Sequence, residues 1–87
     1  MARVLIPALL QPLAGGNAEV AAEGASVGEV IRALEVTFPG LAVRLVQDGR
    51  LRPGISVAVD GVISHRGLRE TVNPASEVIF VAALSGG

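Results

Sequence analysis

The stretch EVIFVAAL, residues 77–84, decides the fold, because its almost unbroken apolar character is typical of a strand covered on both faces. A strand of that kind belongs at the centre of a sheet. The next three residues, Ser85-Gly86-Gly87, contain nothing that would anchor them to a core. We therefore expect a central last strand followed by a flexible tail.

The beginning of the chain predicts a β-hairpin. Residues 3–9, RVLIPAL, are apolar and partly β-branched, which favours a strand. Turn-forming residues follow in LAGGN, residues 13–17, before a second short strand at residues 18–21. Pro7 and Pro12 indicate that the first strand ends irregularly.

A helix should begin at residues 26–29, SVGE, which have the pattern of a capping box. In that motif Ser26 accepts from an amide of the first turn, while Glu29 reaches back to the cap amide. Pro39-Gly40 should end the helix. Its apolar residues recur at steps of three and four, on one face: Val27, Val30, Ile31, Leu34 and Phe38.

The middle of the chain predicts a short second helical turn at residues 41–46 and loops at residues 47–50 and 52–54. ISVAV, residues 55–59, alternates like a half-buried strand. Asp60-Gly61 is a hairpin signal, and a short return strand should follow it at Val62-Ile63.

Together these elements predict a single α+β domain. The two terminal strands should lie side by side in parallel, crossed by the helix. This is the β-grasp, or ubiquitin-like, arrangement: a mixed four- to five-stranded sheet with one main helix packed on one face. A chain of 87 residues is too short for a second core. We assign residues 1–84 to the domain and residues 85–87 to the tail.

Composition argues against several classes of function. The formal net charge of −1 and the scattered arginines disfavour nucleic acid as a partner. Apolar runs stay well short of the roughly 20 residues of a membrane helix, and the first residues do not resemble a signal peptide. We therefore expect a cytoplasmic protein without a membrane partner. The chain has no cysteine for thiolate chemistry, and its single histidine, His65, lacks a second ligand at a metal-binding spacing. We expect no metal site.

The end of the chain, Leu84-Ser85-Gly86-Gly87, resembles the terminal signature of the MoaD/ThiS family of ubiquitin-like sulfur carriers. The resemblance covers essentially the whole chain, and its further matches are Val4-Leu5-Ile6-Pro7, Gly15-Gly16, Val59-Asp60-Gly61 and Ser76-Glu77-Val78. Residues 6–12, followed by Gly15-Gly16, are most similar to the branch that serves cysteine biosynthesis.

The resemblance implies that the chain is a carrier and not itself an enzyme. An activating enzyme of the MoeB/ThiF kind would use ATP and Mg to adenylate the Gly87 carboxylate. Sulfide or a persulfide would then convert it into a thiocarboxylate, and the chain itself would bind no cofactor. The sulfur would pass to an acceptor such as a pyridoxal-phosphate-dependent cysteine synthase, which we favour, the large subunit of molybdopterin synthase, or an enzyme of thiazole synthesis.

Two features should meet these partner enzymes. Gly86 and Gly87 lack a Cβ and let the tail enter a narrow tunnel together with Ser85 and Leu84. The sheet face opposite the helix should be unusually apolar, and exposed apolar patches mark partner surfaces. On that face we expect Leu5 and Ile79 together with the partner-binding residues Pro7, Ile63, Val81 and Ala83. Alternatively, residues 41–51 or self-association cover the patch.

Two other functions stay open at this point. The activated Gly87 carboxylate would make the chain a ubiquitin-like protein modifier if it were joined to lysines of other proteins. A β-grasp interaction module, in contrast, would need no tail. Its binding should survive deletion of Gly86-Gly87.

Overall fold

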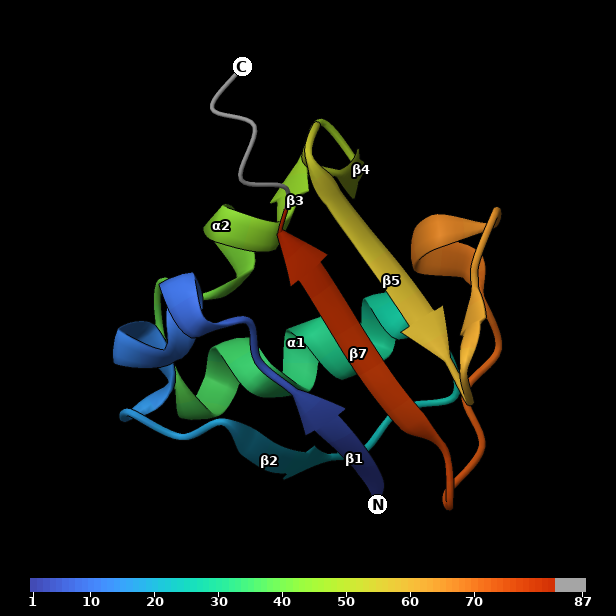
Figure 1. The fold of residues 1–87 in the computed structure, drawn as a ribbon, viewed down its shortest axis with the longest axis horizontal. Coiled ribbons are helices and arrows are strands. Elements are labelled where there is room, and N and C mark those ends of the chain that lie inside the picture. The colour runs from blue at the N-terminus through green and yellow to red at the C-terminus, as the bar shows by residue number, and fades with distance from the viewer. Residues whose placement is uncertain (83–87) are drawn as a thin grey trace.

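The computed structural model describes residues 1–82, whose strands form a five-stranded sheet in the order β2-β1-β7-β5-β6. Figure 1 looks onto this sheet, with the helix α1 behind it. The strand bounds are Ala2–Leu5 for β1, Glu19–Ala22 for β2, Ile55–Val59 for β5, Val62–Ile63 for β6 and Glu77–Ala82 for β7. The terminal strands β1 and β7 pair in parallel, and the other neighbouring strands pair antiparallel. The central position of β7 and the β-grasp arrangement are confirmed. The expectation that both faces of this strand are covered is wrong, because Val81 on one face is 45% exposed.

The helix α1, Val27–Thr37, begins at the predicted cap. The amide of Glu29 donates to Ser26 Oγ at 3.2 Å. In return, Glu29 Oε1 accepts from the amide of Ala25 at 3.0 Å. The prediction had named the cap amide of Ser26, one residue later. Both side chains of the capping box nevertheless accept a backbone hydrogen bond within residues 25–29, and these two bonds fix where the helix starts.

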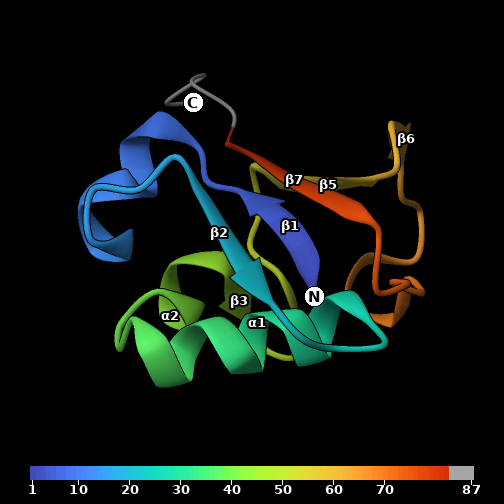
Figure 2. The same ribbon diagram turned by 90° about the horizontal axis from the view of Figure 1, so that it is seen from below.

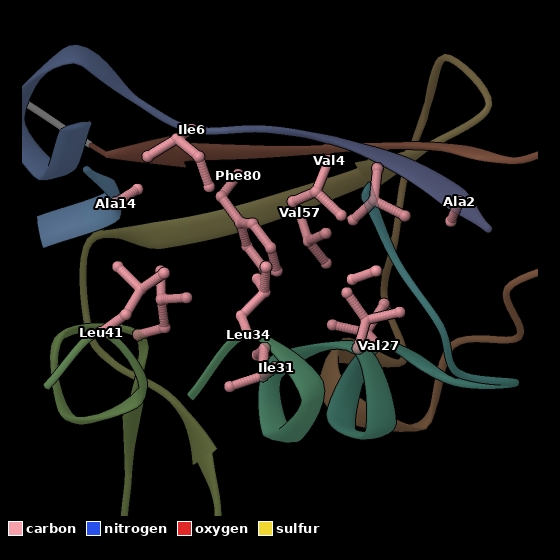
Figure 3. Close-up of a cluster of buried hydrophobic side chains, with 14 of the residues drawn as sticks. Ala2, Val4, Ile6, Ala14, Val27, Ile31, Leu34, Leu41, Val57 and Phe80 are labelled. Carbon is pink, nitrogen blue, oxygen red and sulfur yellow. The ribbon is translucent and has the colours of Figure 1, made fainter. Parts of the chain in front are cut away.

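The core lies between the sheet and α1 (Figure 3). The residues of α1 that are buried have the predicted spacing: Val27, Val30, Ile31 and Leu34. They pack with inward-facing side chains of the sheet such as Val4, Val57 and Phe80, each at most 2% exposed. Phe38, predicted on the same helix face, caps the C-terminal end of α1 and is half-buried. Burial of such side chains stabilises the fold by roughly 25 cal/mol per Å² of apolar surface.

Residues 41–51 pack on the same side of the sheet as α1 (Figure 2). The predicted short helix is present as α2, Ala42–Leu45, and both Leu41 and Leu45 are completely buried. The predicted loop at residues 47–50 is wrong at both ends. A two-residue strand β3, Val46–Gln47, pairs with β4, Arg50–Leu51, and only the Asp48-Gly49 turn lies between them.

The two helices are joined by the side chain of Glu35. Its carboxylate accepts hydrogen bonds from the amides of Gly40 and Ala42, at donor–acceptor distances between 2.9 and 3.1 Å. These bonds, the one from Gly40 first, lower the pKa of Glu35 below its ordinary value. The carboxylate therefore satisfies amides in the connection that neither helix can satisfy itself.

The first strand is shorter than predicted. It ends at Leu5, and Ala8–Ala14 form a 3₁₀ helix (η1) in place of the expected strand end. The turn at Gly15-Gly16 is present, but it follows this helix, and Gly15 adopts a φ of +65°. Leu10 and Ala14 of η1 are buried and extend the core beyond the sheet. A second short 3₁₀ helix, Gly67–Arg69 (η2), was also not predicted. Within the described part of the chain, no helix is long and apolar enough to cross a membrane.

Candidate partner-binding face and carrier tail

The sheet face opposite α1 carries an apolar row that crosses four strands. Strand pairing aligns Leu5 of β1 with Ile79 of β7, Ile79 with Ala58 of β5, and Ala58 with Ile63 of β6. Val81 lies two residues beyond Ile79 and is paired with Ser56. We call this surface the open face and define it by the apolar side chains Leu5, Ala58, Ile63, Ile79 and Val81.

Three of the predicted partner-binding residues fall within the described chain. Ile63 and Val81 are 53% and 45% exposed, which is a large exposed fraction for aliphatic side chains in strands. Pro7 is half-buried and lies just beyond β1, where it caps the N-terminal end of η1. Pairing brings Ile63 and Val81 onto one face, while Pro7 borders that face at the end of β1.

The other predicted site residues lie outside the described residues: Ala83, Leu84, Ser85, Gly86 and Gly87. Their roles in partner binding and in sulfur transfer therefore stay predictions. The structure does define where the described chain leads into them, at Ala82, the last residue of the central strand.

Sequence reasoning missed Ala58 as part of the open face. The side chain is only 8% exposed, although its pairing with Ile79 and Ile63 places it between two larger side chains on that face. The signal was available, because inward-facing Val57 and Val59 leave Ala58 pointing to the other side.

The open face is bordered by ion pairs at the start of β7. A nitrogen of the Arg3 guanidinium lies 2.5 Å from Glu77 Oε2, and another lies 4.0 Å from Glu19 Oε1. These side chains belong to three neighbouring strands. Arg3 and Glu19 are exposed, and Glu77 is half-buried. The pairs contribute little stability, but they set a polar edge beside the apolar row.

Asp60 fastens the start of β7 to the β5–β6 turn. Its Oδ1 accepts from the amide of Glu77, and its Oδ2 accepts from the hydroxyl of Ser76, both at 2.9 Å. The amide of Asp60 in turn donates to the Glu77 carbonyl at 2.9 Å. The hydrogen bond from the Glu77 amide, followed by that from Ser76, lowers the pKa of Asp60. The central strand is thus held at its beginning.

The suggestion that residues 41–51 cover the open face is wrong, because this segment packs beside α1 on the other side of the sheet. Its buried residues, Leu41 and Leu45, belong to the core below the sheet. Self-association through the open face stays an untested alternative.

The described part of the chain contains no group of side chains suited to binding a metal ion. Within residues 1–82, histidine, aspartate and glutamate side chains do not gather in any group of three or more that could hold an ion. His65 is exposed and lies beside η2.

Comparison with known proteins agrees with this architecture. The sequence model of the ThiS family matches residues 4–87. The sulfur carrier protein CysO of Mycobacterium bovis is 32% identical across 97% of this chain and 96% of that protein. Small archaeal modifier protein 3 of Haloferax volcanii is 33% identical across 75% of this chain and 73% of that protein. The crystal structure of the Amycolatopsis orientalis BexX/CysO complex matches with a TM-score of 0.94 and 31% identity, with both chains fully covered. The chain therefore belongs to the ThiS family.

Proposed function

We propose that this chain is a sulfur carrier protein whose Gly87 carboxylate receives sulfur and delivers it to a biosynthetic pathway. The observation that carries the proposal is the likeness to CysO, a protein named as a sulfur carrier, along 97% of this chain. The family match also runs to residue 87 and so includes the Gly86-Gly87 pair. With no cysteine in the sequence, the carboxylate is the group through which this chain can hold sulfur.

The chemistry begins with activation, because a carboxylate is a poor electrophile. An oxygen of the Gly87 carboxylate attacks the α-phosphorus of ATP, and pyrophosphate leaves as the acyl-adenylate forms. Hydrosulfide then attacks the acyl carbon, AMP leaves, and loss of a proton gives the thiocarboxylate. These steps occur in an activating enzyme of the MoeB/ThiF kind, which supplies ATP and Mg. The need for ATP favours a cytoplasmic location.

Delivery uses the nucleophilic sulfur of the thiocarboxylate. The sulfur attacks an activated carbon of the acceptor substrate, a leaving group departs, and hydrolysis of the resulting thioester restores the Gly87 carboxylate. The likeness to CysO favours cysteine synthesis on a pyridoxal-phosphate-dependent enzyme over transfer to molybdopterin or thiazole precursors. The chain itself supplies the reacting terminus and the docking surface.

The fold supports this role because the folded domain can dock on a partner while a different part of the chain, the Gly87 carboxylate, reacts. The central strand β7 is paired on both sides and anchored by Asp60 at its start. Five residues follow Ala82 in the sequence, and they can span at most roughly 17 Å. The open face would rest on the partner while Gly87 enters its active site.

Intact-mass measurement tests the proposal directly. The full-length protein is incubated with the cognate activating enzyme, ATP, Mg and sulfide. We expect a mass increase equal to the difference between sulfur and oxygen, located on Gly87 by fragmentation. A variant lacking Gly86-Gly87 is the control and should show no increase. If wild type fails to gain sulfur while its adenylate still forms, the carrier proposal is wrong.

A second function is favoured by one relative, because small archaeal modifier protein 3 is named as a modifier. In that case the activated Gly87 would form isopeptide bonds with lysines of other proteins. Denaturing gels of cells that produce a tagged chain would then show a ladder of larger conjugates. The ladder should disappear when Gly86-Gly87 is deleted.

A further inference from the structure

The structure gathers arginines from two separate stretches of the sequence, residues 44–52 and 66–69. They line three hollows, of about 430, 460 and 370 Å³, on the side of the molecule formed by α2, the β3–β4 hairpin and η2. The first hollow adjoins Ala82 at the end of β7. We call this strip the basic rim and define it by Arg44, Arg50, Arg52, Arg66 and Arg69.

Neighbouring hollows share lining residues. Pro53 lines both the first and the second, and Arg50 and Leu51 line both the second and the third. His65 adds a titratable side chain to the third hollow. The basic rim therefore consists of adjoining hollows, of which the first lies beside the end of the central strand and the third beside η2.

The charge of the basic rim is not neutralised within the described residues. Among residues 1–82, ion pairs involve only Arg3, which lies on the opposite side of the sheet from α1. Asp48 is the one acidic residue that lines a hollow of the rim. Glu70 follows η2, and its carboxylate accepts from the Ser64 hydroxyl at 2.8 Å and the Thr71 amide at 3.2 Å. It remains charged and offsets part of the positive charge. Five arginines outnumber these two carboxylates, so this side is net positive in a chain whose net charge is −1.

The chemistry of the rim fits carboxylates better than nucleic acid. A guanidinium group presents two parallel donors that match a carboxylate. Binding of single-stranded nucleic acid relies on exposed aromatic rings on which bases stack. The chain has two aromatic residues, Phe38 and Phe80, and neither lines these three hollows.

We propose that the basic rim docks a carboxylate-rich surface of the partner enzyme that acts on Gly87. The proposal rests on the carrier function, because it is the position of the rim beside Ala82 that brings it to such a partner. The open face would provide apolar contact, and the rim would orient the carrier during approach. Complementary charge raises association rates and sets orientation more than it raises affinity.

Octaglutamate is the first probe, titrated into full-length protein and followed by amide NMR shifts. We expect the shifts to concentrate on residues 44–52 and 65–69 and binding to weaken as salt rises. Arg50→Gln should weaken binding about threefold, since Arg50 lines two of the hollows. Arg32→Gln is the matched control, because Arg32 is an exposed arginine on α1 outside the rim.

Three results would overturn the proposal. One is equal binding by the Arg50→Gln and Arg32→Gln proteins. Another is tighter binding of inorganic phosphate or oligothymidylate than of octaglutamate, which would assign the rim to phosphates. The third concerns sulfur loading by the activating enzyme. If the rim docks on that enzyme, Arg50→Gln should raise KM about threefold at low salt with little change in kcat. An unchanged KM would contradict docking by the rim.

The two proposals fail in different ways. Deletion of Gly86-Gly87 should abolish sulfur uptake and leave octaglutamate binding intact. Conversely, an unchanged KM for Arg50→Gln alongside normal sulfur uptake would remove the rim proposal and keep the carrier function.

Discussion

Gly24 is a single residue on which the start of α1 depends. Its φ is +154°, and a Cβ added there would lie 2.7 Å from the Val30 nitrogen and 2.9 Å from the Glu29 carbonyl carbon. Both are backbone atoms of the helix, which cannot rotate away. We expect Gly24→Ala to lower the free energy of unfolding by at least about 2 kcal/mol in chemical denaturation.

Gly16→Ala separates steric overlap from backbone strain. Gly16 also has a positive φ, +80°, but a Cβ there would meet no atom within 4 Å. This control should cost about 1 kcal/mol, which is the usual cost of a left-handed conformation for alanine. Equal losses for the two variants would mean that the helix start yields to the added methyl group.

Asp60 makes the stability of the β7 attachment depend on pH. Its hydrogen bonds from Glu77 and Ser76 favour the charged carboxylate and lower its folded-state pKa below 3.8. A group of this kind contributes stability fully above its unfolded-state pKa and loses that contribution as pH falls through the folded value. We expect Asp60→Asn to lower Tm at neutral pH and the difference from wild type to shrink below pH 3.8.

The substitution by asparagine is chosen for its backbone behaviour. Asp60 has a φ of +51°, a conformation that asparagine also adopts readily, so the change tests the charge and the acceptor oxygens. Glu23→Gln, at an exposed position outside this hydrogen-bond network, controls for the loss of one negative charge. A Tm difference that stays constant through the acid range would contradict the assignment.

At the scale of elements, the cap of α1 is a local device with a measurable effect. Ser26 Oγ accepts from Glu29, and the Glu29 carboxylate accepts from Ala25. We expect Ser26→Ala to reduce the free energy of unfolding by about 1 kcal/mol. Ser26→Asp keeps an acceptor at the same place and should retain most of the stability. Equal losses in both variants would show that the cap hydrogen bond does not stabilise the helix.

This locality explains which elements the sequence predicts well. The start of α1 depends on residues 24–29, and the β5–β6 hairpin depends on Asp60-Gly61, so both can be read from a few neighbouring residues. η1 was missed because RVLI at residues 3–6 suggested a strand that continues. The following Ala8, Leu9 and Leu10 are not β-branched and favour helical conformations.

The features that the sequence did not predict depend either on very short strands or on pairing between distant segments. The β3–β4 ladder has two residues in each strand, which is too short for an alternation pattern to appear. Alternation did predict which side of β7 is open, but alignment of Ile63 with Ile79 through Ala58 depends on strand register. The basic rim was likewise invisible in the sequence, because the fold brings Arg44 and Arg69 to the same side of the molecule.

At the scale of the whole molecule, the open face and the tail should act together, and Ile63 can separate their contributions. Ile63 is 53% exposed on the edge strand β6, and β5 lies between that strand and β7. Ile63 is therefore not paired directly with the strand that leads into the tail. We expect Ile63→Asp to lower kcat/KM for sulfur loading by the activating enzyme about tenfold, because it places a charge in an apolar contact.

Val36→Asp is the matched control for this experiment. Val36 is 84% exposed on α1, on the side of the molecule away from the open face, and its substitution should change kcat/KM less than about twofold. Circular dichroism and Tm establish that both variants fold.

Sedimentation velocity tests the remaining alternative, self-association through the open face. If a second copy covers that face, wild type will sediment as a dimer and Ile63→Asp as a monomer. Loading of a monomeric Ile63→Asp protein at the wild-type rate would then mean that the apolar row serves self-association, and that the partner enzyme recognises the carrier elsewhere.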